Sequence, residues 1–355
     1  MIKILKTKEE LILMQDSWNE LYTQSSSVSP FQTFDYVLAA WNFLNEKDSK
    51  LHVICVYRQK DKLLQALFPF CLKKKNYLVF INDNHSDFCS EIVRKEFADD
   101  YHVYEEVADY IKSNEEIRGM RFDNQRPDSR LSAYFCYFFV SPVVVRRTAF
   151  STVSISKNDN QTKNVVDTLP NLNTKDRYRL KNIQKKAVGE DFVVYSKNEG
   201  KEYPETTIKQ LIDDMIDNKI RTEDYFDGRM LTLFSDLYHA GLLQVHVTLK
   251  EETPLAANLY LKSSDCNEYI DWIALYKEKK YNLDNLLATI SHIAEIGGVL
   301  NFARGTYPYK IHNFRPCISN LYRFQYSKTM VGSIGVLIDA AWINAKQIIK
   351  RIVRK

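Results

Sequence analysis

The stretch FARGTYPYK groups several side chains that could do chemistry. Arg304 can bind an anionic group through two hydrogen bonds, Tyr309 can donate or accept a proton, and Lys310 can neutralise a carboxylate or a phosphate. The preceding apolar run VLNFA predicts that they lie at the tip of a buried strand. Gly305 permits a positive φ and a sharp exit, and Pro308 predicts the start of a short helix. The pattern is typical of an active-site wall or of a structural corner.

A carboxylate lies inside a second apolar strand, EYIDWIALY. Alternation places Asp271 on the same face as Tyr269 and Ile273. Burial raises the pKa of such a carboxyl, which suits a general base for an amine or a hydroxyl. The alternative is a structural ion pair with a Lys or Arg side chain, Arg304 among them.

The surrounding segments predict how these residues are positioned. LLQVHVTLK, PLAANLYLK and EYIDWIALY form an antiparallel meander, followed by a helix over 283–296 and the strand VLNFA. Asn282 is the expected N-cap of the helix and Gly297 its end. In the first half, LHVICVYR and LLQALFPFCLKK form a hairpin. This order predicts an α+β, mixed α/β fold rather than an all-parallel one.

The polar stretch SKNDNQTKN predicts a domain boundary, giving domains at 1–160 and 161–330 and a separate helix at 331–355. That last helix is amphipathic and basic, so it could lie on an anionic membrane surface, on the protein body or on a second subunit. Its apolar stripe consists of Ile338, Trp342, Ala345, Ile349 and Ile352.

Composition limits the classes of function. The chain has 355 residues, 45% of them hydrophobic, and a net charge of +4, so no DNA partner is expected. Ten glycines are too few for a fold built on several glycine-rich nucleotide turns. The six cysteines are scattered, so no metal site is predicted.

Without a signal peptide or a spanning segment, the expected location is the cytoplasm, or the inner membrane face if the terminal helix binds there. The oligomeric state stays open.

The order of elements and these motifs resemble the GNAT-type acyltransferases. More narrowly, they resemble the cellulose-biosynthesis (CelD-like) branch, a relative of the Fem-type aminoacyl transferases. The resemblance covers most of the chain and is carried by SPFQTFDYVLAAW, LLQALFPFCLKK, SDFCSEIV, TKDRYRLKNIQKKA, GLLQVHVTLKEETPLAANLYL and FARGTYPYK. It implies tandem GNAT-like domains, each a mostly antiparallel mixed sheet flanked by helices, with the acyl-donor site in the second.

In such domains the helix after the splayed strand points its N-terminus at the pyrophosphate of coenzyme A. Here that site would be KEKKYNLDN, where the family usually has glycine and this chain has Tyr281 and Asn282. Asp284 also carries the wrong charge for an anion site. The stretch therefore predicts an adapted coenzyme A site, a site for another activated acyl carrier, or a fold that has lost donor binding. The expected cofactor-binding residues are Lys279, Lys280, Asn282, Leu283 and Asn285.

The resemblance assigns roles to the remaining residues. Asp271 would be the base or its orienter, and Tyr309 would reprotonate the leaving thiolate. Arg304, Lys310 and Arg177, the last on the basic helix TKDRYRLKNIQKKA, would contact an acidic substrate such as a lipid-linked sugar phosphate, although that helix could equally be a solvated face.

The predicted function is transfer of an acyl group, acetyl from acetyl-CoA, to an amine or hydroxyl of a sugar or cell-envelope precursor. One alternative is a Fem-type aminoacyl transferase that uses aminoacyl-tRNA. The other is a non-catalytic binding or scaffold protein of a polysaccharide pathway.

Overall fold

The computed structural model describes residues 1–26, 29–81, 83, 85–158, 164–187, 189–226, 228–262 and 267–353, with side chains as far as residue 349. Most of the predicted boundary stretch and the side chain of Ile352 lie outside these residues. The chain divides into two compact units: Met1–Thr148 with Ser319–Lys355, and Ala149–Ile318.

This division differs from the predicted one, because the end of the chain belongs to the first unit. Strand β15 (Cys317–Ser327) pairs antiparallel with β8 (Gly119–Gln125), which lies about two hundred residues earlier in the chain. Local composition cannot reveal a pairing between segments so far apart. The predicted terminal helix therefore starts directly after a strand of the first unit.

The first unit contains two runs of paired strands, ordered β1-β3-β4-β7 and β15-β8-β6-β5-β2. Pairing is antiparallel except between β6 and β8. The other strands of this unit are β1 (Ile2–Leu5), β2 (Lys50–Leu51), β3 (Val53–Tyr57), β4 (Leu64–Phe68), β5 (Phe70–Lys73), β6 (Tyr77–Phe80) and β7 (Ile92–Val93). Its helices are α1 (Lys8–Ile12), α2 (Gln15–Thr23), α3 (Phe34–Leu44), α4 (Tyr101–Ser113), α5 (Arg130–Phe138) and α11 (Met330–Val353).

The core of the first unit is largely aromatic. Phe122 on β8 stacks on Phe70 on β5 with ring centroids 4.8 Å apart, and Phe80 and Phe324 pack against the same ring. Such pairs add to the free energy of burying the rings. The abundant phenylalanines of the sequence therefore have a structural role here.

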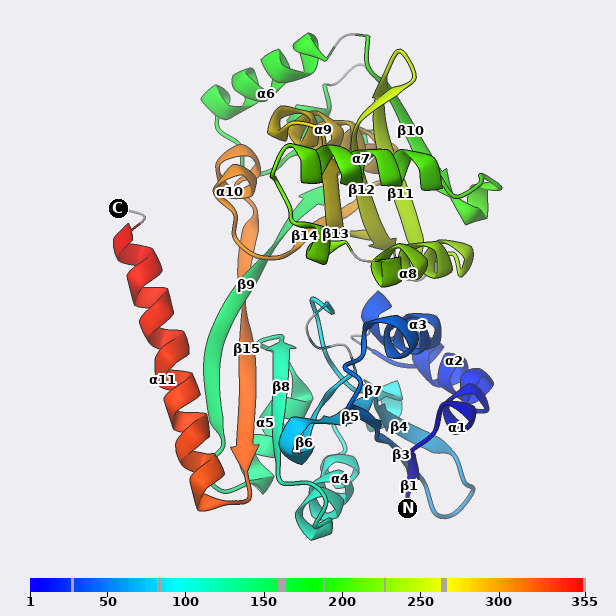
Figure 1. Ribbon diagram of the computed structural model, residues 1–355, viewed down its shortest axis with the longest axis vertical. Helices are drawn as coiled ribbons and strands as arrows, with labels where there is room; N and C mark the ends of the chain where they lie inside the picture. The colour runs from blue at the N-terminus through cyan, green and yellow to red at the C-terminus, as the bar shows by residue number, and fades with distance from the viewer. Residues whose placement is uncertain are drawn as a thin grey trace. The chain divides into compact units, whose positions relative to one another are not determined.

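The second unit has one sheet, ordered β10-β11-β12-β13-β14-β9. The predicted meander is confirmed as the antiparallel strands β11, β12 and β13. Helices α7 and α8 lie in front of the sheet and α9 behind it (Figure 1). The strands are β10 (Asp191–Ser196), β11 (Leu243–Lys250), β12 (Thr253–Lys262), β13 (Glu268–Tyr276), β14 (Gly298–Arg304) and β9 (Val143–Ile155), which begins in the first unit. The helices are α6 (Thr174–Lys186), α7 (Glu205–Asp217), α8 (Gly228–His239), α9 (Lys279–Ile296) and α10 (Pro308–Phe314).

Strands β13 and β14 are parallel and separate early. They pair over three residues only, and the last pair is Ile270 with Asn301. Helix α9 connects them and packs Leu286, Leu287 and Ile290 into the core behind the sheet. The predicted mixed α/β fold is confirmed, and the separation leaves the rest of β13 without a partner on that side among the described strands.

One buried histidine should make the stability of the first unit depend on pH. His52 is 1% exposed, and its Nε2 lies 2.9 Å from the hydroxyl of Tyr110. Burial lowers the pKa of His52 from 6.5 to about 4. The unfolded chain thus binds this proton at a higher pH than the folded chain, so the free energy of unfolding should fall by about 3 kcal/mol between pH 6.5 and 4.

Denaturant unfolding measured across this pH range checks the prediction. His52→Gln should flatten the dependence, whereas His102→Gln, at a side chain that is 62% exposed, should leave it unchanged. Equal slopes in the wild type and His52→Gln would contradict it.

Candidate active site

The centre of the site is a buried ion pair just beyond the point where β13 and β14 separate. Oδ2 of Asp271 lies 3.2 Å from Nζ of Lys310, and their side chains are 2% and 6% exposed. Oδ1 of Asp271 accepts a hydrogen bond from Nδ2 of Asn258 (2.7 Å), and Lys310 donates to the carbonyl of Phe302 (2.7 Å). A buried charge is stable only with such a partner. The structure therefore pairs Asp271 with Lys310.

The sharp exit from β14 brings Lys310 back to the sheet. Gly305 has a φ of 109°, and its N–H donates to the carbonyl of Ala149 (2.8 Å). A Cβ atom at this position would lie 2.8 Å from the ring of Tyr307. Helix α10 then begins at Pro308. The predictions of a positive φ at Gly305 and of a helix starting at the proline are confirmed.

Tyr309 lies beside the ion pair, and the residue as a whole is 37% exposed. Burial of its hydroxyl end raises the pKa of Tyr309, the charge of Asp271 raises it further, and a hydrogen bond from Asn282 acts in the opposite direction. The phenol is therefore protonated at neutral pH and can donate a hydrogen bond. Nζ of Lys310 lies 5.8 Å from the centre of the Tyr309 ring.

Two buried amide oxygens near the pair have no donor. Asn258 is fully buried and Asn282 is 4% exposed, yet Oδ1 of each lacks a hydrogen-bond partner among the described residues. The amide nitrogen of Asn258 is bound to Asp271, so its oxygen must point elsewhere. Unpaired buried acceptors are rare in folded proteins and suggest a ligand or an ordered water. Sequence reasoning missed Asn258, although a polar residue inside the apolar strand PLAANLYLK was the available signal.

The start of α9 differs from the predicted donor site. The helix begins at Lys279, so Asn282 is not its N-cap, and the backbone of Leu283 lies beyond the first turn, where N–H groups are free. Leu283 instead packs on the core, and Asn285 donates to the carbonyl of His246 (2.9 Å).

Acidic side chains also lie at and near the first turn of α9. The N-cap is Glu278, which forms an ion pair with Lys280 (3.0 Å), while Lys279 is exposed. Burial raises the pKa of the half-buried Asp284, and Lys280 partly opposes this. A negative charge at the N-cap opposes the binding of an anionic donor group there, so the predicted pyrophosphate site fits poorly.

The structure also describes the two remaining predicted substrate contacts, Arg177 and Arg304. The guanidinium of Arg177 donates to the carbonyls of Val166 (2.8 Å), Leu169 (2.8 Å) and Leu172 (3.2 Å). These bonds hold the segment before α6 in place, and we assign Arg177 a structural role instead of a substrate contact. Arg304 ends β14 opposite Phe150 and is partly exposed.

The parts of the chain that the structure describes contain no group of three or more His, Cys, Asp or Glu side chains placed to hold a metal ion. In the same parts, no helix combines the length and the apolar character needed to cross a membrane.

Comparison with known proteins shows which solved structures share this fold. No protein-family model and no curated protein matches the sequence. Among solved structures, the C-terminal domain of a putative lysylphosphatidylglycerol synthetase from Agrobacterium fabrum is 12% identical, with a TM-score of 0.57 over 94% of this chain and 96% of that one. L-PGS from Bacillus licheniformis is 12% identical, with a TM-score of 0.58 over 91% and 95%. FemX is 10% identical, with a TM-score of 0.58 over 92% and 97%.

These likenesses show the fold alone, which is the tandem GNAT-like fold that the sequence predicted. They include Fem-type structures and do not single out the CelD-like branch.

The Asp271–Lys310 pair can be tested by a double-mutant cycle. Asp271→Asn leaves a buried ammonium without its counter-charge and should lower the free energy of unfolding by about 3–5 kcal/mol, as should Lys310→Met for the carboxylate. The double variant should be markedly more stable than the sum of the two losses predicts. Urea unfolding measures all four proteins, and additive losses would show that the two side chains are not coupled.

Proposed function

We propose that the second unit transfers an aminoacyl group from an ester donor to an amine or hydroxyl acceptor. The tandem GNAT-like fold, shared with proteins named as lysylphosphatidylglycerol synthetases and with FemX, supports an acyl or aminoacyl transferase. The ion pair and the adjacent phenol of Tyr309 at the separation of two strands support a reaction centre there.

The unpaired oxygens of Asn258 and Asn282 are the observation that favours an aminoacyl donor. An aminoacyl group brings an α-ammonium with three N–H donors, and the carboxylate of Asp271 lies beside the amide of Asn258. An acetyl group brings no donor, so each oxygen would remain buried and unpaired at a cost of about 1–3 kcal/mol. The site thus selects for an acyl group that carries an amine.

Lys310 is suited to stabilise the tetrahedral intermediate. Two of its three N–H groups point to the carbonyl of Phe302 and to Asp271, and the third has no partner among the described residues. That third N–H can bind the oxyanion formed when the acceptor attacks the ester carbonyl. Asp271 supplies the counter-charge and orients the ammonium, so its role is to position Lys310.

Tyr309 can balance the protons of the reaction. When the intermediate collapses, the carbon–oxygen bond to the leaving group breaks, and the leaving oxygen takes the proton of the phenol. The phenolate then removes the surplus proton from the attacking nitrogen or oxygen, which restores Tyr309. The raised pKa makes the phenolate a strong enough base for this second step.

Transfer of acetyl from acetyl-CoA to a sugar or cell-envelope precursor is the second candidate. The exposed Lys279 and the nearby Lys280 favour it, because both could meet phosphate groups at the start of α9. The N-cap Glu278, Asp284 and the missing glycine turn count against it. For either donor, Arg304 remains the proposed contact for an acidic group of the acceptor.

Removal of one hydroxyl tests the role of Tyr309. Tyr309→Phe should lower kcat by about 10²–10⁴-fold, the usual contribution of a positioned acid–base group, with KM little changed. Tyr307→Phe is the matched control, since its ring stacks on Tyr309 at 6.2 Å and is 51% exposed. Steady-state kinetics of aminoacyl transfer gives both values, and equal kcat for the two variants would remove Tyr309 from the mechanism.

Calorimetry can decide between the donors. A non-hydrolysable aminoacyl-adenosine amide should bind, and N-acetylation of its α-amino group should weaken binding by at least about tenfold, because each lost hydrogen bond to a buried acceptor costs 1–3 kcal/mol. Asn258→Leu should abolish this preference for the free amine.

The same experiment with acetyl-CoA tests the second candidate. Binding of acetyl-CoA that is weakened by Lys279→Glu with Lys280→Glu would establish the coenzyme A site instead. Binding of neither donor would leave the non-catalytic alternative.

A further inference from the structure

The first unit contains a large cavity that is separate from the proposed transfer site. It has a volume of about 1060 Å³ and is lined by residues of β5, β6, β8, β15 and α11. Every lining residue belongs to the first unit. The first unit therefore supplies the whole lining of the cavity.

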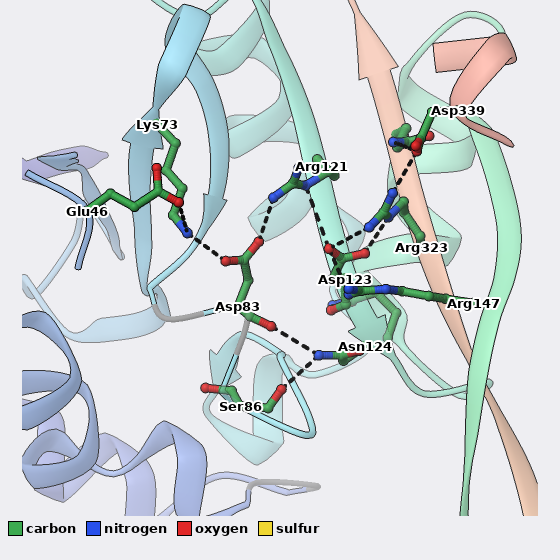
Figure 2. Close-up of polar contacts among 12 residues, drawn as sticks. Glu46, Lys73, Asp83, Ser86, Arg121, Asp123, Asn124, Arg147, Arg323 and Asp339 are labelled. Atoms are coloured by element: carbon green, nitrogen blue, oxygen red, sulfur yellow. Dashed lines mark hydrogen bonds and ion pairs between the residues drawn. The ribbon is translucent and has the colours of Figure 1, made fainter. Parts of the chain in front are cut away.

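A continuous network of ion pairs, which we call the floor, includes five of the lining residues: Glu46, Lys73, Arg121, Arg323 and Asp339 (Figure 2). Asp83 is fully buried and pairs with Lys73 (2.7 Å) and Arg121 (3.0 Å). Asp123, 1% exposed, pairs with Arg147 (2.8 Å), and its two carboxylate oxygens accept hydrogen bonds from Nε and Nη2 of Arg323. The outer carboxylates complete the network: Glu46 lies 3.6 Å from Lys73, and Asp339 lies 2.6 Å from Arg323.

The charges of this floor cancel. Lys73, Arg121, Arg147 and Arg323 supply four positive charges, and Glu46, Asp83, Asp123 and Asp339 supply four negative ones. The opposing contacts explain the titration of Asp83: burial by itself would raise its pKa, but Lys73 and Arg121 hold the pKa below its usual value. The floor is therefore neutral and rigid, and it does not need a ligand for charge balance.

The rim, in contrast, has a surplus of positive charge. Lys74, Lys75 and Arg118 line the cavity and are exposed. Their side chains form no ion pair or hydrogen bond with any other described residue. Lys75 and the following Asn76 also have φ values of 64° and 57°, a conformation that glycine would adopt more easily. The turn from β5 to β6 thus holds two unpaired lysines at the mouth of the cavity.

One residue of the cavity lining has a buried acceptor without a partner among the described residues. Gln325 lines the cavity and is 5% exposed. Its Nε2 donates to Asp339 (2.8 Å), but its Oε1 has no partner among the described residues. A hydroxyl group of a ligand would satisfy it.

One wall of the cavity is apolar. Val331 and Val336 of α11 line the cavity together with Tyr77 and Val79 of β6. A Cβ atom at Gly335, between the two valines, would meet no atom within 4 Å, so the helix leaves room there. Next to the cavity α11 carries the exposed side chains of Met330, Val331, Ile334, Leu337, Ile338 and Trp342.

From this arrangement we infer that the cavity binds a phosphate ester that carries a hydroxyl group. Three unpaired cations exceed what a single carboxylate would need, and a phosphate offers up to two charges and three acceptor oxygens. The hydroxyl group donates to Oε1 of Gln325, and the carbon skeleton lies along the valines of α11. Two sources have this chemistry: a soluble polyol phosphate, and the headgroup of an anionic phospholipid whose bilayer would meet the apolar side chains of α11.

The test uses the full-length protein with two probes. Glycerol phosphate is titrated by calorimetry, and phosphatidylcholine vesicles with or without phosphatidylinositol are tested by co-sedimentation. Binding of the soluble probe identifies a soluble ligand, and binding that requires phosphatidylinositol identifies a membrane headgroup. Either result supports the site if it responds to the variants below.

Lys74→Glu with Lys75→Glu should weaken binding by at least about tenfold, because two attractions become repulsions near the phosphate. Gly335→Leu should block the cavity, whereas Gly335→Ala should not. Lys8→Glu with Lys60→Glu is the charge-matched control at exposed positions of the same unit and should bind as the wild type does. The inference is overturned if neither probe binds, or if the charge reversal at Lys74 and Lys75 changes binding no more than the control does.

Discussion

The buried carboxylate of Asp271 is the constraint on which the second unit depends. A charge in the middle of an apolar strand is tolerated only with a counter-charge, and Lys310 supplies it from 39 residues further along the chain. To reach that position the chain must leave β14 sharply at Gly305 and start a helix at Pro308. The same path places Tyr309 beside the pair, so the ion pair that stabilises the fold and the arrangement that we propose for catalysis come from one geometry.

The first unit also contains buried carboxylates, but their counter-charges are arranged differently. Asp83, which follows β6, and Asp123 on β8 are also buried, but each is shared by several cations that form one network. Because those charges cancel inside the network, the lysines of the β5–β6 turn and Arg118 remain available at its edge. Two related folds in one chain thus present different chemistry: a small buried centre in one and a wide basic cavity in the other.

Patterns within one segment were predictable from the sequence, and pairings between distant segments were not. Alternation and turn residues located the meander, the positive φ at Gly305 and the start of α10. The partner of Asp271, the return of β15 to the first unit and the roles of Arg177 and Asn285 depend on contacts that local composition does not encode. The charged network was missed although its signal was present, since MRFDNQ and LYRFQ also carry charges inside apolar strands. A charged residue inside an apolar run, the signal that identified Asp271, is equally present at Asp123 and Arg323.

A crystal structure of the protein with a non-hydrolysable aminoacyl-adenosine amide would test the central claim most directly. We expect the amide carbonyl within hydrogen-bond distance of Nζ of Lys310, the α-ammonium against the oxygens of Asn258 and Asn282, and the phenol of Tyr309 next to the ribose oxygen that leaves in the reaction. An analogue bound elsewhere, or one that leaves these oxygens without a donor, would contradict the assignment of this centre to aminoacyl transfer.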